Sequence, residues 1–389
     1  MTTLEDLRLT LFFTAGLSLT EWDRLGMLER ETALYRTLRP HLGGISFVTY
    51  GDRRDLEYRS RLEGIDVACN RWRLPDLWYW RWLAAVPARW KTGAVIFKSN
   101  QVSGGDTALA LARRFHKPFI ARCGYLHSDF TIRRFGPDSP QAKRSLQQEG
   151  NLFRAADQVV VTTPLMAQVV NGIHGVAIDR IRVIPNYVDV DRFAPAQPGT
   201  VHTPGNRVLF IGRLDAQKAP LLLLRALAGL SAELVMVGDG PMRLQVETLA
   251  QELGVRVTLM GVQPHAALPD LMRGADLFVL PSDYEGHPKA LLEAMACGMA
   301  VIGRADAPGV REAIDHDSTG LLCDATPEGM RTAMARILSD PPLKARLGRN
   351  ARAHAVNHLS LARTVERERE LLTELLAEPR RPSPAGKPG

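Results

Sequence analysis

The amino-acid sequence predicts an α/β protein made of two Rossmann-like, doubly wound domains. Three observations support this class: a length of 389 residues, a composition with 45% hydrophobic and 23% charged residues, and short β-branched apolar runs that alternate with longer amphipathic stretches. A domain has roughly 150 residues, so this length suits two domains with separate cores. The alternation is typical of βαβ units, and the composition excludes collagen-like, largely disordered and multi-span membrane proteins.

The apolar runs predict the strands of both sheets. In the second half of the chain they fall at 207–212, 233–238, 255–261, 276–282, 300–303 and 320–323. In the first half they fall at 7–13, 45–51, 94–99, 118–123 and 158–163, with helices predicted at about 26–39, 106–115 and 141–156. Open parallel sheets bind ligands at the carboxyl ends of their strands, so the function is expected in a central cleft that the two domains face.

The predicted first domain covers residues 1–192, and the second covers residues 207–358. Residues 193–206 between them are rich in Pro, Gly and Thr and show no hydrophobic period, which indicates a linker. A helix at about 359–377 is expected to end the folded chain and to pack back on the first domain. Residues 378–389 have the composition of a disordered tail.

Cysteine spacing and hydropathy limit the cellular context. The four cysteines have no CxxC spacing, which favours reduced thiols over disulfides or a zinc site. No stretch reaches the roughly 18 apolar residues of a spanning helix, and the first residues lack the basic segment of a signal peptide. We therefore expect a cytoplasmic protein.

The positive charge is concentrated in the first half of the chain. The formal net charge is +7, with 27 basic and 20 acidic residues in 1–200 but 22 of each in 201–389. Residues 53–144 alone hold 18 basic and 8 acidic side chains. Such an excess is compatible with nucleic acid, an anionic membrane or phosphorylated ligands as partners.

The segment 282–298 carries the strongest signal for chemistry. Glu285 lies in the loop after a predicted strand, Pro288 suits the first turn of the next helix, and Glu293 lies more than one turn into that helix. The helix start offers backbone N–H groups to a phosphate, and the two carboxylates can accept hydrogen bonds from sugar hydroxyls. Taken alone, two glutamates at this spacing would more often be a loop residue and a solvated helix residue.

Two further strand ends strengthen this interpretation. Arg213 and Lys218 lie in the loop that opens a helix, where two cations are well placed to neutralise a diphosphate. Gly238 and Gly240 form the turn after the next strand, where glycine permits close approach of a ligand, although ordinary turn chemistry explains each of them equally well. The ordered set at successive strand ends favours a nucleotide-sugar site.

At these motifs the sequence resembles the retaining, GT-B-fold glycosyltransferases of family 4. The resemblance is carried by FIGRLDAQKAP (210–220), VMVGDGP (235–241), 271–303, APGVREAIDHDSTGLLC (307–323) and the junction VIPNYVDVDRFAP (183–195). The first half matches more loosely, through 15–38, FKSNQVSGG (97–105) and ARCGYLHSDF (121–130). The resemblance thus covers most of the chain, but its specific motifs lie after residue 207.

The resemblance implies transfer of a sugar from a nucleotide diphosphate sugar, a co-substrate, with no metal or other cofactor. Arg213 and Lys218 would bind the diphosphate, Glu285 the hydroxyls of the transferred sugar and Glu293 the ribose. His287 and Lys289 replace the family's usual residues, and Lys289 is a candidate third cation for the phosphate. The implied donor-binding set is Gly16, Arg213, Lys218, Gly238, Gly240, Glu285, Gly286, His287, Pro288, Lys289, Ala290 and Glu293. The implied catalytic set is Glu285, Arg213, Lys218 and His127.

The resemblance also points to residues of the first domain. Gly16 follows the first strand, in a loop that closes over the donor phosphate in this family. His127 is the nearest candidate for the family's histidine after the strand at 118–123, although a single loop histidine is more often merely solvated. Arg122, Tyr125 and Asn100 are candidates for the acceptor side.

Two competing signals are weaker. Asp189-Val190-Asp191 is a DxD sequence that would hold a metal in another glycosyltransferase fold, but it lies in the domain junction and is interpreted as structural. No GxGxxG follows a predicted strand, which argues against a dinucleotide-dependent oxidoreductase. That oxidoreductase and a catalytically silent sugar-nucleotide-binding module remain the alternatives.

Five of the six tryptophans fall within residues 72–90, among Arg and Lys residues. Tryptophan prefers the membrane interface, and each cation near an anionic surface contributes about 1 kcal/mol. Trp78, Trp80, Trp82 and Arg81 are therefore candidates for membrane contact, with core packing and base stacking as alternatives. The expected enzyme acts in polysaccharide or glycolipid synthesis on a glycan or lipid-linked acceptor, peripheral on the inner membrane face, without a nucleic-acid partner.

Overall fold

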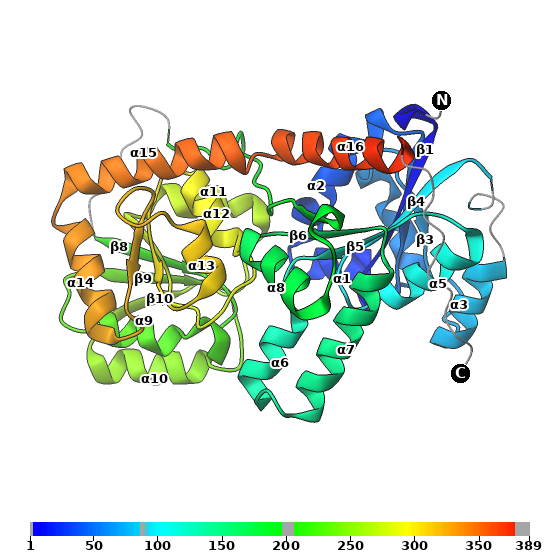
Figure 1. Ribbon diagram of the computed structural model, residues 1–389. Helices are drawn as coiled ribbons and strands as arrows, with labels where there is room; N and C mark the ends of the chain where they lie inside the picture. Colours follow the sequence, from blue (N-terminus) through cyan, green and yellow to red (C-terminus); the bar gives the residue numbers. More distant parts are fainter. Residues whose placement is uncertain (1–2, 86–89, 91, 197–205, 378–389) are drawn as a thin grey trace. The chain divides into compact units, whose positions relative to one another are not determined.

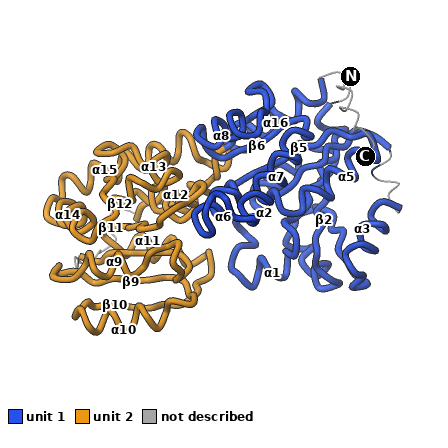
Figure 2. Tube along the Cα trace, turned by 60° about the horizontal axis from the view of Figure 1, so that its bottom comes forward, with its two compact units in different colours: residues 1–184, 364–389 blue, residues 185–363 orange. Residues whose placement is uncertain are grey.

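The structure, a computed structural model, describes residues 3–85, 90, 92–196 and 206–377 (Figure 1). The chain forms two compact units: unit 1 comprises residues 1–184 and 364–389, and unit 2 comprises residues 185–363 (Figure 2). The predicted tail and most of the predicted linker lie outside the described residues.

The predicted domain boundary at residue 192 is placed too late in the chain. The amide of Val188 donates to the carbonyl of Leu359, and the amide of Leu361 donates to the carbonyl of Val188, at 2.8 and 2.9 Å. Val188 and Phe193 are also buried in the core of unit 2. Pairing and burial together assign the segment after Ile184 to unit 2.

Unit 1 is built on a seven-stranded parallel sheet in the order β3-β2-β1-β4-β5-β6-β7. Its strands are β1 Leu7–Phe12, β2 Gly44–Val48, β3 Asp66–Ala68, β4 Ala94–Ser99, β5 Phe119–Cys123, β6 Gln158–Val161 and β7 Ile181–Val183. The five longer strands were predicted, whereas β3 and β7 have three residues each and are too short to show a hydrophobic period.

The helices of unit 1 begin at local signals in the sequence. They are α1 Leu19–Arg24, α2 Leu28–Leu38, α3 Asp76–Ala85, α5 Gly105–Phe115, α6 His127–Phe135, α7 Pro140–Ala155 and α8 Pro164–His174, with most of α16 Leu361–Ala377. Ser139 and Thr163 cap α7 and α8, and each helix has proline in its first turn. The predicted helix at 26–39 corresponds to α2.

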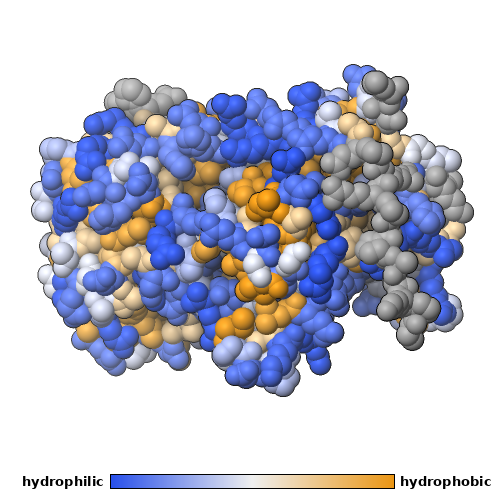
Figure 3. Space-filling view, in the orientation of Figure 1, coloured by the Kyte–Doolittle hydropathy of each residue, from blue (hydrophilic) through white to orange (hydrophobic). Residues whose placement is uncertain are grey.

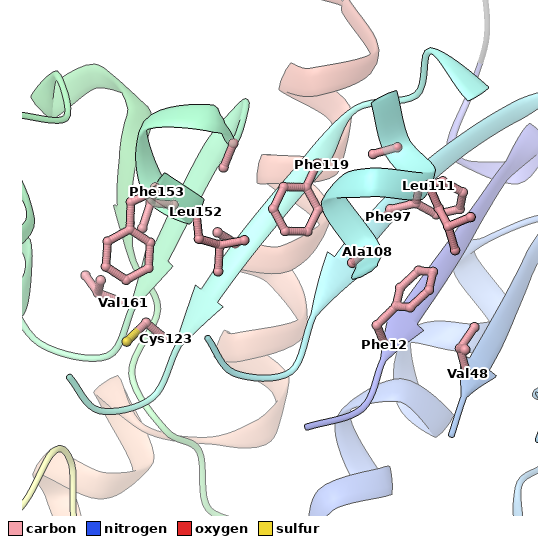
Figure 4. Close-up of a cluster of buried hydrophobic side chains, with 14 of the residues drawn as sticks. Phe12, Val48, Phe97, Ala108, Leu111, Phe119, Cys123, Leu152, Phe153 and Val161 are labelled. Carbon is pink, nitrogen blue, oxygen red and sulfur yellow. The ribbon is translucent and has the colours of Figure 1, made fainter. Parts of the chain in front are cut away.

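The core of unit 1 lies against the sheet, under α5 and α7. Figure 4 shows Phe12, Phe97 and Phe119 from neighbouring strands, with Leu111 of α5 near Phe97 and Leu152 of α7 on the side of Phe119. All five side chains are at most 3% exposed. Burying a large apolar side chain contributes about 1.5–3 kcal/mol. Because strands of a parallel sheet are covered on both faces, their sequences are nearly continuous apolar runs.

Unit 2 contains a six-stranded parallel sheet in the order β10-β9-β8-β11-β12-β13. The strands are β8 Arg207–Ile211, β9 Glu233–Val237, β10 Arg256–Leu259, β11 Leu277–Leu280, β12 Ala300–Arg304 and β13 Leu321–Cys323. All six predicted strands are confirmed. The helices are α9 Pro220–Leu227, α10 Arg243–Leu253, α11 Leu268–Arg273, α12 Lys289–Ala296, α13 Pro308–Ala313, α14 Pro327–Leu338 and α15 Pro341–His358.

Both sheets have the strand order of a Rossmann fold, which confirms the predicted class. The order reverses between β1 and β4 in unit 1 and between β8 and β11 in unit 2. Ligands of doubly wound sheets bind beyond the carboxyl ends of the strands at this reversal. The loops after these four strands are therefore the first places to examine for a site.

The surface and the cysteines add two findings. Within the described part of the chain, no helix combines the length and the apolar character that crossing a membrane requires. Most residues on the face in Figure 3 are hydrophilic, and hydrophobic residues gather in the region of α8, where Ile173 is 62% exposed. The four cysteines are buried and form no disulfide.

Candidate active site

The loops after β8 and β11 meet where the strand order of unit 2 reverses. The amide of Asp283 donates to the carbonyl of Gln217 over 2.8 Å. The side-chain amide of Gln217 donates to the carbonyl of Tyr284 over 3.0 Å. These bonds hold the segment with the predicted cations against the segment with Glu285. Gln217 was not singled out from the sequence, because its role depends on a contact between distant loops.

Lys218 and Glu285 form an ion pair across this junction, between Nζ and Oε1. Their side chains are 16% and 9% exposed, so water screens the two charges poorly. The carboxylate of Asp215 accepts a hydrogen bond from the amide of Lys218 over 3.1 Å and fixes the turn that carries the lysine. The structure thus brings together two residues that the sequence placed 67 positions apart.

Arg213 lies on the same loop with a much more exposed side chain. Its guanidinium is 3.2 Å from the carboxylate of Asp215 and donates to Oε1 of Gln217 over 3.3 Å. The side chain is 71% exposed. A guanidinium has five N–H donors, so these two contacts leave donors for an anionic ligand at this edge of the sheet.

Gly238 and Gly240 are required by backbone packing between two loops. Gly238 has a φ of +128°, and a Cβ there would lie 2.0 Å from the carbonyl oxygen of Gly212. A Cβ at Gly240 would lie 2.4 Å from the carbonyl oxygen of Leu214. The turn-chemistry interpretation is therefore sufficient for both glycines, and their contact with a donor stays a prediction.

Pro288 and His287 lie at the start of α12. Pro288 is the residue before the helix, and its carbonyl accepts from the amides of Leu291 and Leu292 at 3.1 and 3.2 Å. The N-terminal end of a helix attracts anions. Nδ1 of His287 accepts from the amide of Asn186 over 3.0 Å, and the His287 carbonyl accepts from the Asn186 side chain over 2.7 Å. Burial, with a smaller contribution from the charge of His354, lowers the pKa of His287 to about 4. His287 is therefore a neutral anchor for the loop, and its Nδ1 is engaged.

Glu293 lies inside α12 and is 2% exposed. Its Oε1 is 2.8 Å from Nε2 of His265, in the loop after β10. The sequence indicated Glu293 but gave no reason to select His265, since the pairing arises only when α12 packs beside that loop. The ribose contact implied for Glu293 stays a prediction.

Arg304 and Gly309 support the Glu285 loop from the side of β12. Arg304 is 8% exposed, donates to both carboxylate oxygens of Asp306 at 2.9 and 2.7 Å, and forms an ion pair with Asp283. A Cβ at Gly309 would lie 2.1 Å from the carbonyl oxygen of Gly286. Neither residue was selected from the sequence, because both act through backbone and loop contacts.

In unit 1, the candidates Gly16 and Asn100 lie on the loops that follow β1 and β4, and Arg122 lies near the carboxyl end of β5. The side chain of Asn100 donates to Oγ1 of Thr14 over 3.3 Å, and Nη1 of Arg122 donates to the carbonyl of Asn100 over 3.1 Å. Gly16 has a φ of +78°, which favours glycine, and no atom lies within 4 Å of a Cβ there. The contacts confirm neighbouring positions for Asn100 and Arg122 but assign them no ligand.

Tyr125 and His127 lie further along the loop after β5. The ring of Tyr125 is 4.9 Å from the ring of Phe130, between centroids, and packs on α6. His127 is the first residue of α6 and is exposed. The next residue, Ser128, is tied through its amide to the buried carboxylate of Glu149 over 2.8 Å. The structure thus fixes the start of this helix, and a role for His127 stays a prediction.

The predicted membrane-contact set divides into two pairs. Trp78 is 56% exposed, and the guanidinium of Arg81 lies 5.1 Å from its ring centroid. Trp80 and Trp82, in contrast, pack against the core, with Tyr79 at 5.3 and 6.0 Å between ring centroids. Both rings are only partly buried, and Trp82 also lies 5.0 Å from the exposed Trp72 between ring centroids, so their membrane contact stays a prediction.

No group of three or more metal-ligating side chains occurs in the described residues. The first aspartate of the DxD sequence, Asp189, accepts a hydrogen bond from the amide of Arg192 over 3.1 Å, which stabilises the turn before Phe193. This contact is the one expected of a structural aspartate in a turn.

Comparison with protein families gives two matches that together cover most of the chain. A family model described as "Glycosyl transferases group 1" matches residues 196–354. A second, described as "Glycosyltransferase Family 4", matches residues 34–192.

Curated relatives include D-inositol 3-phosphate glycosyltransferases of several bacteria. The enzyme of Saccharomonospora viridis is 31% identical over 263 residues, which are 62% of this chain and 61% of the relative, so less than two thirds of that relative's length is spanned. The enzyme of Thermobispora bispora is 30% identical over 314 residues, or 75% of this chain and 73% of the relative.

Solved structures with the same fold cover nearly the whole chain. HepE of Anabaena, in complex with UDP and glucose, has a TM-score of 0.76 at 17% identity over 94% of this chain and 99% of that chain. A sucrose-phosphate synthase of Thermosynechococcus elongatus has a TM-score of 0.74 at 22% identity over 95% and 99%. At these identities the likeness concerns the fold.

Proposed function

The chain belongs to glycosyltransferase family 4, and from this premise we propose that it transfers a sugar from a nucleoside diphosphate donor to an acceptor with retention of anomeric configuration. The observation that carries the proposal is the Lys218–Glu285 pair, with Arg213 on the same loop, at the strand reversal of unit 2. That HepE was solved with UDP supports a nucleotide donor. The oxidoreductase alternative has no support in the family comparison.

The donor diphosphate is proposed to lie between the two cations and the start of α12. Arg213 and Lys218 would neutralise the charge that develops on the leaving phosphate, and the first-turn N–H groups of α12 would bind its oxygens. In this arrangement the protein's cations do the work that a divalent ion does elsewhere. We therefore expect EDTA to leave the transfer rate unchanged.

Glu285 is proposed to bind the sugar and not to attack it. Its carboxylate is held by Lys218 and is needed as an acceptor for sugar hydroxyls. In the proposed step the bond from the anomeric carbon to the phosphate oxygen breaks, and its electron pair stays on the phosphate. The acceptor oxygen then bonds to the anomeric carbon on the same face, and its proton passes to the leaving phosphate.

The acceptor is proposed to be an anionic glycan or lipid-linked molecule bound by unit 1. This unit holds 31 basic and 23 acidic residues, whereas unit 2 holds 18 and 19. Arg122 and Asn100, beside the strand reversal, are the proposed contacts. The names of the curated relatives, which specify an inositol phosphate, are compatible with a phosphorylated acceptor.

Unit 1 is further proposed to contact an anionic membrane through an exposed patch formed by Trp72, Trp78 and Arg81. The two tryptophans are 49% and 56% exposed. The Arg71 guanidinium is 4.0 Å from the Trp72 ring centroid, which gives the patch a second arginine–tryptophan pair. Such pairs suit an interface where rings meet lipid and cations meet headgroups.

The membrane proposal is tested by sedimentation with vesicles of phosphatidylglycerol and phosphatidylcholine. The W78S/R81S variant should bind several-fold less than the unaltered protein. A matched control is R133S, since Arg133 is an exposed arginine of α6. Equal binding of both variants at low salt would contradict the assignment.

The transfer reaction is tested with Glu285→Gln, which keeps the size of the side chain but removes its charge. Release of UDP or GDP from a panel of nucleotide sugars should fall by about 100-fold or more, because a removed electrostatic contact in an active site has effects of this size. A protein that binds a nucleotide but never turns over would instead be a silent binding module. Turnover that Glu285→Gln leaves unchanged would remove the carboxylate from the reaction.

A further inference from the structure

His265 and Glu293 form a buried pair beside α12, the helix whose start is proposed to bind the donor diphosphate. Nε2 of His265 is 2.8 Å from Oε1 of Glu293, and the side chains are 9% and 3% exposed. His265 follows β10 and Glu293 lies in α12, after β11. The pair therefore links the loop after β10 to the helix after β11, although these two strands are not neighbours in the sheet.

The chemistry of the carboxylate sets the direction of the hydrogen bond between His265 and Glu293. An ionised carboxylate only accepts hydrogen bonds, so Nε2 of His265 carries the proton and donates it to Oε1. Nδ1 is buried and has no hydrogen-bond partner among the described residues. Nδ1 therefore makes no second hydrogen bond that competes with the one to Glu293.

Packing keeps the imidazole in place. The ring of Phe193 lies against it, with centroids 5.1 Å apart and an angle of 47° between the planes. Phe193 is 1% exposed and belongs to the core of unit 2. Held between this ring and Glu293, His265 has little freedom to change rotamer, and the carboxylate it contacts is held with it.

We propose that His265 is a positioning residue for the nucleotide, which acts by orienting the Glu293 carboxylate toward the ribose hydroxyls. One hydrogen bond from His265 occupies one of about four lone-pair positions on the carboxylate, so acceptor positions remain for a diol. The inference rests on the proposed donor site. It adds that ribose recognition depends on a histidine from a separate loop.

The experiment measures the affinity of the full-length protein for UDP and for 2′,3′-dideoxy-UDP by calorimetry. His265→Leu removes the donor and keeps an apolar side chain of similar bulk. We expect it to weaken UDP binding by about 10-fold, as loss of a hydrogen bond to a charged group would. Binding of the dideoxy analogue should change less than about 2-fold, because that ligand has no ribose hydroxyls for Glu293 to recognise.

His265→Gln serves as the conservative variant, because its side-chain amide can donate to Glu293. It should recover most of the discrimination between UDP and the dideoxy analogue. Equal losses for both ligands in His265→Leu, or no loss at all, would overturn the proposed role and leave the pair as a packing contact. If the unaltered protein bound neither UDP nor GDP, the donor site itself would be wrong, and the positioning role would fall with it.

Discussion

The two units share one strand order but use it differently. In both sheets the strand order reverses beside the first strand, and loops with polar side chains lie at that point. In unit 2 these loops bring together residues of opposite charge, whereas unit 1 carries the net positive charge of the chain and its exposed Arg–Trp pairs. A common scaffold is thus combined with a proposed donor site in one unit and an excess of basic residues in the other.

The largest expected effect is a loss of stability when the buried Lys98–Glu368 ion pair of unit 1, which lies outside the proposed site, is broken. In unit 1 the buried Lys98 forms an ion pair with Glu368 of α16, and both side chains are at most 2% exposed. Lys98→Met leaves a buried carboxylate without its counter-ion, so the free energy of unfolding should fall by ~3–5 kcal/mol. Urea unfolding would measure this loss. The double variant K98M/E368L should recover most of it; a double variant as unstable as K98M would contradict the explanation.

In unit 2, replacement of Lys218 should lower activity more than any other substitution in this set. Lys218→Ala removes the cation from the Glu285 pair, and kcat should fall by about 100-fold or more through lost stabilisation of the leaving phosphate. Lys344→Ala is the matched control, since Lys344 pairs with Asp276 at 2.7 Å, just before β11 and away from the carboxyl ends of the strands. Similar kcat losses in both variants would show that the effect is not specific to the site.

Acid sensitivity of unit 2 should depend on His287. Its pKa is lowered from 6.5 to about 4 in the folded protein. Between these pH values the His287 side chain is protonated in the unfolded chain but neutral in the folded one. Stability from this group is therefore complete above pH 6.5 and is lost as the pH falls toward 4, by up to ~3 kcal/mol. His287→Asn keeps an acceptor for the Asn186 amide but does not titrate. Thermal melts at pH 7 and 5 should differ less for this variant, and an unchanged difference would exclude His287 as the cause.

The smallest expected effect concerns the acceptor side of unit 1. Arg122→Gln should raise the KM for an anionic acceptor by about 10-fold through loss of one charge-assisted hydrogen bond. It should leave the KM for the donor unchanged, because Arg122 belongs to the other unit. Initial rates with each substrate varied in turn would show this. A change confined to the donor KM would contradict the assignment of unit 1 to the acceptor.

Sequence reasoning was more successful in unit 2 than in unit 1. All six strands of unit 2 were predicted because each is a short apolar run followed by glycine or a polar loop. In unit 1, β3 and β7 were missed because three residues show no period. The sequence also did not show that Trp80 and Trp82 of α3 are partly buried against the core. For an aromatic helix such as α3, composition cannot tell which side faces the core.

The sequence by itself determined the two α/β units, the sheet-forming runs and the positions of Arg213, Lys218 and Glu285 at strand ends. These follow from hydrophobic period and turn residues, which act over a few neighbouring positions. Only the tertiary structure decided that Lys218 meets Glu285, that His265 meets Glu293 and that Lys98 meets Glu368. These partners are separated by 67, 28 and 270 positions, and they meet because strand order and helix packing bring distant strands, helices and loops together.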